Sequence, residues 1–206
     1  MPTFHESGLA FTFPDDWAVL PFDQHPYYHV LSGHGVSGVD FMALLSDGTL
    51  LLLEVKNYTD PYPDRDLAQL PGFVHNFEGY SQRMARKLTD SLRAVRIVDR
   101  MLRRKRWYRF LIRYPNWLKR LAPRWWWWHQ AAVAGASTDK IWFVLWAENL
   151  EPIGGYAVTE FAHLKRKLEQ RVRDLLVETT ERVEIRWIGS ESETIFQVTV
   201  LQIGLI

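Results

Sequence analysis

The sequence contains no cysteine among its 206 residues. The absence of thiols excludes disulfides and thiolate metal sites, and it favours an intracellular setting. Long apolar runs are also missing, and without about 18 uncharged apolar residues in a row an ordinary spanning helix is not expected. The first residues lack the basic segment followed by an apolar segment that marks a secretory signal. We therefore expect a cytoplasmic protein without a membrane span.

Acidic and basic side chains are segregated along the chain, although the net charge is only +1. Residues 1–82 carry 11 acidic and 2 basic side chains, whereas residues 83–124 carry 2 acidic and 15 basic ones. Residues 125–206 are mildly acidic, with 11 acidic and 8 basic side chains. A basic block of this kind indicates a polyanionic partner, either nucleic acid or an anionic membrane surface. A solvated basic helix face is the alternative.

The apolar pattern predicts strands and long helices in one domain spanning residues 1–206. VDFMALL and TLLLLEV are apolar runs joined by SDG, which predicts a β-hairpin. Spacings of three and four residues predict a long helix from near Tyr80 and another from about 158 to 179. KIWFVLWAE, RVEIRWI and TIFQVTVLQIGLI are typical of strands, and the first 35 residues of short strands and turns. This order predicts an α/β fold with a mixed central sheet flanked by helices.

Three charged residues fall on or beside the predicted hairpin, where burial makes charge costly. Glu54 and Lys56 are two apart in a strand that is otherwise Leu and Val, so they project from the same face. Asp40 begins the partner strand. If residues 46–48 form a three-residue loop, Asp40 pairs with Glu54 and their carboxylates share a face. A two-residue loop would pair Asp40 with Val55 and separate the carboxylates.

Two convergent carboxylates beside a lysine suit metal-dependent phosphodiester hydrolysis. The carboxylates of Asp40 and Glu54 offer oxygen ligands to Mg²⁺ (or Mn²⁺), which lowers the pKa of a bound water. The Lys56 ammonium can orient that water or stabilise negative charge that develops on the phosphoryl group. Acyl transfer is disfavoured, because no serine or cysteine nucleophile is evident beside a base. A structural salt bridge between Glu54 and Lys56 is the alternative.

The residues around the hairpin resemble the signature of the PD-(D/E)xK nuclease superfamily. The resemblance is carried by Val39-Asp40, the spacing of fourteen to Glu54, and Glu54-Val55-Lys56. The hairpin, the long helix and the apolar strand that follows are also similar in order to the superfamily core. FTFPDDWAVLPFD and the hairpin after it resemble a group of small uncharacterised bacterial proteins. The resemblance implies a restriction-endonuclease-like architecture and a metal-dependent endonuclease or exonuclease, with defence against foreign DNA as one setting.

The same resemblance implies a role for each residue of the motif. Asp40 and Glu54 would be metal ligands, with the Val55 carbonyl as a third ligand, and Lys56 would be the catalytic lysine. Val39 stands where the motif name has proline, which is a permissive position.

Four other residues lie at the margin of the predicted site. Glu6 is a candidate for the further acidic residue that the superfamily places on its first helix, although HESGLAF is not clearly helical. Asp23 is an outer candidate on resemblance alone. Lys87 and Asp90 fall on the long helix, where a solvated helix face is the favoured interpretation.

A basic, tryptophan-rich segment forms an insertion at about 103–130, which we call the basic insert. Residues 103–128 contain nine basic and no acidic side chains, interleaved with aromatic ones. Such a segment can contact phosphates and stack on unpaired bases, lie on a membrane surface, or pack Trp125–Trp128 against the body or a second subunit. The first reading is preferred because the motif calls for a phosphodiester polymer. The predicted nucleic-acid contacts are Arg103, Arg104, Lys105, Arg106, Arg109 and Arg113.

We therefore expect a Mg²⁺-dependent nuclease whose partner is nucleic acid, in the first instance DNA. Two alternatives stay open. One is a noncatalytic nucleic-acid-binding module that has kept the nuclease fold. The other is a membrane-surface protein anchored by the basic insert. A homodimer is compatible with each of them.

Overall fold

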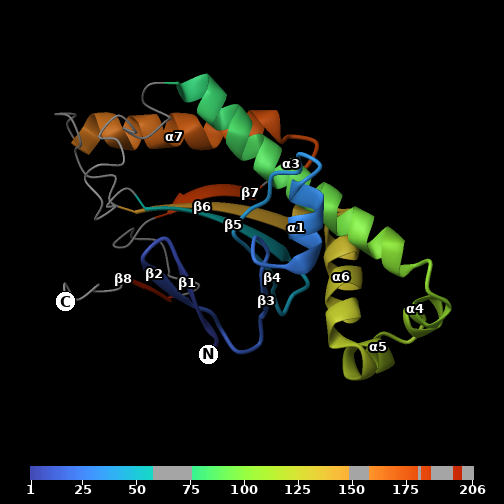
Figure 1. The fold of residues 1–206 in the computed structure, drawn as a ribbon. Coiled ribbons are helices and arrows are strands. Elements are labelled where there is room, and N and C mark those ends of the chain that lie inside the picture. The colour runs from blue at the N-terminus through green and yellow to red at the C-terminus, as the bar shows by residue number, and fades with distance from the viewer. Residues whose placement is uncertain (58–75, 149–157, 181, 187–196, 201–206) are drawn as a thin grey trace.

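The computed structural model describes residues 1–57, 76–148, 158–180, 182–186 and 197–200. A central five-stranded sheet has helices on one face and a three-stranded sheet on the other (Figure 1). The predicted mixed α/β fold is confirmed. The expected helical layers are found on one face only in the described part of the chain, because short strands cover the other face.

The central sheet has the strand order β3-β4-β5-β6-β7. β3 (Ala18–Pro21), β4 (Phe41–Leu44) and β5 (Leu50–Asn57) are antiparallel neighbours. β6 (Ile141–Glu148) and β7 (Arg182–Arg186) continue the sheet in parallel with β5. β5 as far as Leu53 and β6 as far as Ala147 are continuous apolar runs, because both faces of these strands are covered. The predicted hairpin and the predicted strand at 141–147 are confirmed.

Helices α3 (Phe77–Leu102) and α7 (Val158–Leu175) lie across one face of the sheet (Figure 1). The buried side of α3 repeats every three or four residues, as in Leu88, Leu92 and Val95, and it packs on the β-strand side chains of that face. Both long helices predicted from the sequence are therefore present.

A short helix, α1 (Pro26–Ser32), falls in the region where the sequence predicts only strands and turns. Pro26 occupies its first turn, where a missing backbone N–H costs nothing. The His25 side chain accepts a hydrogen bond from the Tyr27 N–H at 3.2 Å and so caps the helix. The helix has only seven residues, too few for apolar periodicity to reveal it.

The opposite face of the central sheet is covered by β1 (Thr3–Glu6), β2 (Leu9–Thr12) and β8 (Gln197–Val200), which form an antiparallel sheet. Their side of the core is aromatic. Phe11 meets Trp146 of β6 edge-on, with ring centroids 5.8 Å apart. Edge-to-face contact of this kind adds to the burial of apolar area. Part of the last predicted strand lies outside the described residues.

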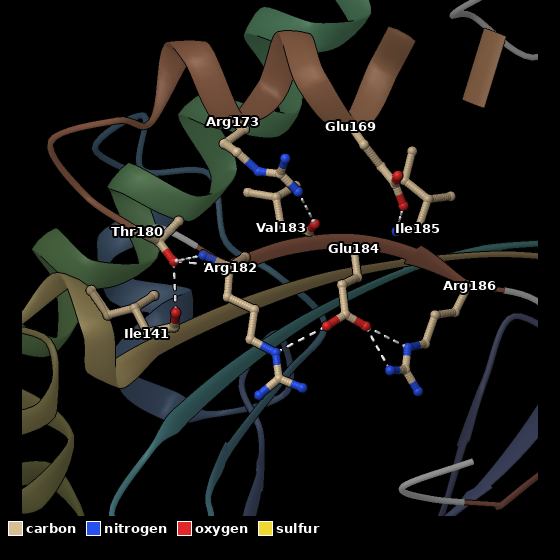
Figure 2. Close-up of polar contacts among 9 residues, drawn as sticks. All are labelled: Ile141, Glu169, Arg173, Thr180, Arg182, Val183, Glu184, Ile185 and Arg186. Carbon is tan, nitrogen blue, oxygen red and sulfur yellow. Dashed lines mark hydrogen bonds and ion pairs between the residues drawn. The ribbon is translucent and has the colours of Figure 1, made fainter. Parts of the chain in front are cut away.

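The far edge of the central sheet is held by polar contacts to β7 (Figure 2). The Glu169 carboxylate of α7 accepts a hydrogen bond from the Ile185 N–H at 2.7 Å. Arg173 of the same helix donates to the Val183 carbonyl at 3.3 Å. The Thr180 hydroxyl accepts from the Arg182 N–H of β7 at 3.1 Å and donates to the Ile141 carbonyl of β6 at 2.6 Å. These side chains occupy backbone groups that an edge strand would otherwise expose.

The basic insert folds into α4 (Arg106–Leu111) and α5 (Pro115–Leu121), which lie beyond the end of α3, and α6 (Pro123–Ala134), which returns to pack against α3 (Figure 1). The two prolines that break the sequence pattern begin α5 and α6. Trp127 and Trp128 are buried in the core on the helical face, so packing against the body is confirmed for this pair.

A buried carboxylate ties the insert to α3. Asp99 accepts a hydrogen bond from the Tyr108 hydroxyl at 2.5 Å and from the Arg103 guanidinium at 2.6 Å. Burial, followed by the hydrogen bond to Asp99, raises the pKa of Tyr108. The insert is therefore attached firmly to the body through one end of α3.

Candidate active site

The loop between β4 and β5 sets the alignment of the hairpin. The Leu45 N–H bonds the Thr49 carbonyl at 2.9 Å, and the Gly48 N–H bonds the Leu45 carbonyl at 3.0 Å. Gly48 has φ +81°, a left-handed conformation that glycine adopts without strain. The Thr49 N–H also bonds Asp47 at 2.8 Å, which closes the turn. The predicted three-residue loop is confirmed.

This loop brings Asp40 and Glu54 opposite each other. β4 and β5 are paired up to Phe41 and Leu53, so the next pair in the same register is Asp40 with Glu54. The Asp40 carboxylate accepts a hydrogen bond from the Val55 N–H at 2.6 Å, which fixes it against β5. The two carboxylates therefore meet on one face of the sheet, as the register argument predicts.

Helix α3 holds the chain segment that leads into Asp40. The Asp90 carboxylate accepts from the Ser37 N–H at 3.0 Å, and the Ser91 hydroxyl accepts from the Val39 N–H at 3.0 Å. On its other side, the Asp40 carbonyl accepts from the Phe22 N–H at 2.8 Å. The solvated-face interpretation of Asp90 is wrong, because this side chain occupies a backbone donor of the site's own loop.

Glu54 is fully buried and carries two ammonium groups. Its Oε1 lies 2.5 Å from Nζ of Lys56 and 2.6 Å from Nζ of Lys87. Lys87 reaches it from α3 and is only 23% exposed, so the solvated-face interpretation is wrong for this residue too. A buried carboxylate is tolerable only when its charge is balanced, and two lysines supply that balance.

The pKa of the Asp40 carboxyl lies near neutral pH. Burial, and then the nearby charge of Glu54, raise the pKa of Asp40 to about 7. The Val55 N–H and the ammonium groups of Lys56 and Lys87 oppose this rise. A carboxyl with a pKa so close to physiological pH gives up its proton readily when a cation approaches.

The donor set fits one divalent cation. Oε2 of Glu54 is buried and has no hydrogen-bond partner in the described part of the chain. Within that part no cluster of three or more Asp, Glu or His side chains could hold a metal. Mg²⁺ needs only one or two protein carboxylates and keeps several waters. The unsatisfied Oε2 of Glu54 together with Asp40 meets that requirement.

Val55 contributes to the site through its backbone. Its side chain belongs to the apolar cluster on the opposite face of the sheet, and its N–H is bonded to Asp40. The assignment of its carbonyl as a metal ligand stays a prediction.

Asp23 lies close enough to the site for the charge of Lys87 to affect its pKa. Burial, and then the charge of Glu6, raise the pKa of Asp23, whereas Lys87 opposes the rise. Its Oδ1 is buried without a hydrogen-bond partner among the described residues. Glu6 itself stands at the end of strand β1, which agrees with the absence of a helical pattern in HESGLAF. Its membership of the site stays a prediction.

Comparison with known proteins identifies no relative. No family model, no curated protein and no solved structure matches the chain.

The cations predicted to contact nucleic acid stand apart from the Asp40–Glu54 pair. All six are exposed. The insert begins sixteen residues after Lys87, which is roughly 24 Å along the axis of α3. Arg103 is also engaged by Asp99. These cations are not part of the carboxylate site, and their contact with nucleic acid stays a prediction.

A groove of about 1010 Å³ opens beside the edge strand β3. It lies among β3, the start of α1 and the run Trp125–Trp128, with Lys119 and Arg124 contributing cations. Trp127 donates its indole N–H to the Ala18 carbonyl at 2.6 Å and so covers that strand edge. None of Asp40, Glu54, Lys56 and Lys87 lines this groove.

Proposed function

We propose that the chain is a metal-dependent nuclease that hydrolyses phosphodiester bonds of nucleic acid, in the first instance DNA. The observation that carries the proposal is the meeting of Asp40 with the buried Glu54, whose Oε2 has no hydrogen-bond partner in the described part of the chain. Two lysines on the other oxygen of Glu54 complete the site. A restriction-endonuclease-like architecture and a cytoplasmic location form part of the proposal.

Each side chain has a task in this chemistry. Mg²⁺ or Mn²⁺, when bound, would supply a polarised water and neutralise charge on a phosphoryl oxygen. Asp40 and Oε2 of Glu54 would hold that ion. Lys56 is 35% exposed, so its ammonium can turn from Glu54 toward a phosphate or the attacking water. Lys87 keeps the Glu54 side chain in place.

The substrate would approach along α3. Arg83 and Arg86 are exposed on this helix within about one turn of Lys87. Their guanidinium groups suit phosphate oxygens and offset the acidic charge of residues 1–82. We propose these two as the phosphate contacts nearest the scissile bond. The cations from Arg103 to Arg113 stay as predicted contacts with more distant phosphates.

A cleavage assay tests the function. Wild-type protein is incubated with supercoiled plasmid and with single-stranded and duplex oligonucleotides, in Mg²⁺, in Mn²⁺ and in chelator. We expect metal-dependent cleavage that Lys56→Ala abolishes. Lys140→Ala is the matched control, since Lys140 is also half-buried but lies at the opposite end of the sheet. Equal cleavage by wild type and Lys56→Ala would exclude the site from the reaction.

A noncatalytic nucleic-acid-binding module is the second candidate. The observation that favours it is that both lysines already neutralise Glu54, as in a purely structural ion pair. In that case the protein binds oligonucleotides without cleaving them in either metal, and Lys56→Ala leaves the affinity unchanged. The same assay, with binding measured in parallel, separates the two candidates.

A further inference from the structure

The outer side of the basic insert displays a row of aromatic rings. Trp107 is 74% exposed, Phe110 46%, Tyr114 49% and Trp117 60%. We call these four residues the aromatic strip. Successive ring centroids lie 6.4, 5.4 and 5.8 Å apart, so the strip is continuous. Contiguous exposed apolar surface of this kind marks an interaction site in a soluble domain.

The strip is the exposed side of two short amphipathic helices, α4 and α5, whose other side packs against the body. Tyr108, Leu111 and Leu118 of the same helices are buried against the body. Met101 and Leu121, which precede and follow the strip in the sequence, are 42% and 65% exposed. Six of the eleven exposed large hydrophobic side chains of the described residues therefore fall between positions 101 and 121.

Positive charge surrounds this apolar face. Residues 103–128 hold nine basic and no acidic side chains, and Arg106, Arg109 and Arg113 are exposed on the same helices and their connection. Lys119 of α5 lies over the Trp126 ring at 4.8 Å, with its stem along the insert's surface. A partner that meets both the rings and the cations must be anionic and must also offer an apolar layer.

We propose that the aromatic strip docks the protein on the surface of an anionic lipid bilayer. Indole and phenol rings, together with Leu121 and Met101, would enter the boundary between headgroups and acyl chains. Arg106, Arg109 and Arg113 would meet lipid phosphates in place of the nucleic-acid contacts predicted for them from the sequence. This mode needs no spanning helix. None of the described helices is long and apolar enough to cross a membrane.

Lipid suits the strip better than nucleic acid for two reasons. The rings contact one another edge-on or tilted at 5.4–6.4 Å, which leaves no slot for a base between them. The exposed aliphatic side chains of Met101 and Leu121 have no face on which a base could stack, but they gain from transfer into an acyl layer. The helices that carry the strip, α4 and α5, also lie at the outer end of the molecule, beyond α3 (Figure 1), so docking would leave the Asp40–Glu54 pair accessible.

Vesicle co-sedimentation tests the proposal on the full chain. Wild-type protein is mixed with vesicles of phosphatidylcholine alone and with vesicles that also contain phosphatidylglycerol. We expect binding to the anionic vesicles to be at least about tenfold stronger. Trp107→Ser with Trp117→Ser should abolish it, whereas Trp107→Phe with Trp117→Phe should retain most of it. Val30→Ser with Val177→Ser, at sites 66% and 70% exposed elsewhere, is the control and should bind normally.

Three results would overturn the proposal. The first is no binding of wild type to anionic vesicles, with or without salt. The second is full binding by the double-serine variant with a normal circular dichroism spectrum, which would reduce the interaction to charge alone. The third is a double-serine variant that loses affinity for a single-stranded oligonucleotide, or that converts a dimer to a monomer, while its vesicle binding is unchanged. In that case the strip serves nucleic acid or a second copy of the chain.

Discussion

The protonation state of Asp40 controls whether the proposed site can bind a cation. Its pKa of about 7 lies far above that of a solvated aspartate, because burial and Glu54 both disfavour its charge. Between about pH 4 and pH 7 the folded protein therefore binds a proton that the unfolded chain has released. This group makes the free energy of unfolding fall as the pH rises through that window.

Asp40→Asn removes this pH-dependent contribution to the free energy of unfolding. We expect the variant and the wild type to have similar stability near pH 4, and the variant to be more stable at pH 8 by on the order of 1–3 kcal/mol. Asparagine keeps a side-chain oxygen for the Val55 N–H. Urea unfolding in chelator at several pH values measures the difference. A constant difference between the two proteins from pH 4 to pH 8 would show that Asp40 ionises normally.

Lys87 supports the buried charge of Glu54 from a different element. Lys87→Met keeps the aliphatic stem but leaves Glu54 with Lys56 as its ion-pair partner. We expect a loss of about 1–3 kcal/mol in the free energy of unfolding at pH 8. Arg93→Met, at an exposed position of the same helix, is the control and should change stability little. Equal effects of the two substitutions would contradict a structural ion pair at Glu54.

The β4–β5 hairpin is the element that creates the site, and its loop depends on Gly48. At φ +81° a side chain is strained even though no atom lies within 4 Å of the added Cβ. Gly48→Ala should therefore destabilise the protein by about 1–2 kcal/mol, and Gly48→Asn by less, because asparagine tolerates this conformation. Urea unfolding measures both. Equal stability of the alanine variant and wild type would mean that the loop is not the three-residue turn.

At the scale of the whole molecule, sequence patterns predicted what is local and missed what depends on packing. The Asp-Gly turn and the two apolar runs predicted the hairpin but left two registers open, and the three-residue loop in the structure selects the one that pairs Asp40 with Glu54. The contact of Lys87 with Glu54 joins residues 33 apart, and it depends on how α3 crosses the sheet. No periodicity carries that information. The short strands β1 and β2 could be predicted as strands, but not as the cover of the second face.

The basic insert shows the same limit. Its charge predicts a polyanionic partner, yet its tryptophans differ in burial, and Trp125 and Trp126 are intermediate. Trp127 and Trp128 belong to the core, whereas Trp107 and Trp117 face solvent. Composition alone could not distinguish them, because the difference depends on which side of each short helix meets the body.

Divalent-cation binding tests the central claim most directly, since every catalytic role follows from an ion held by Asp40 and Glu54. Calorimetric titration of the full chain with Mn²⁺ at pH 6 and pH 8 should show one ion per chain, bound more tightly at pH 8 because Asp40 must lose its proton. Glu54→Gln should abolish the binding, and Lys140→Ala should leave it intact. Binding that is absent in the wild type, or unchanged by Glu54→Gln, would contradict the account.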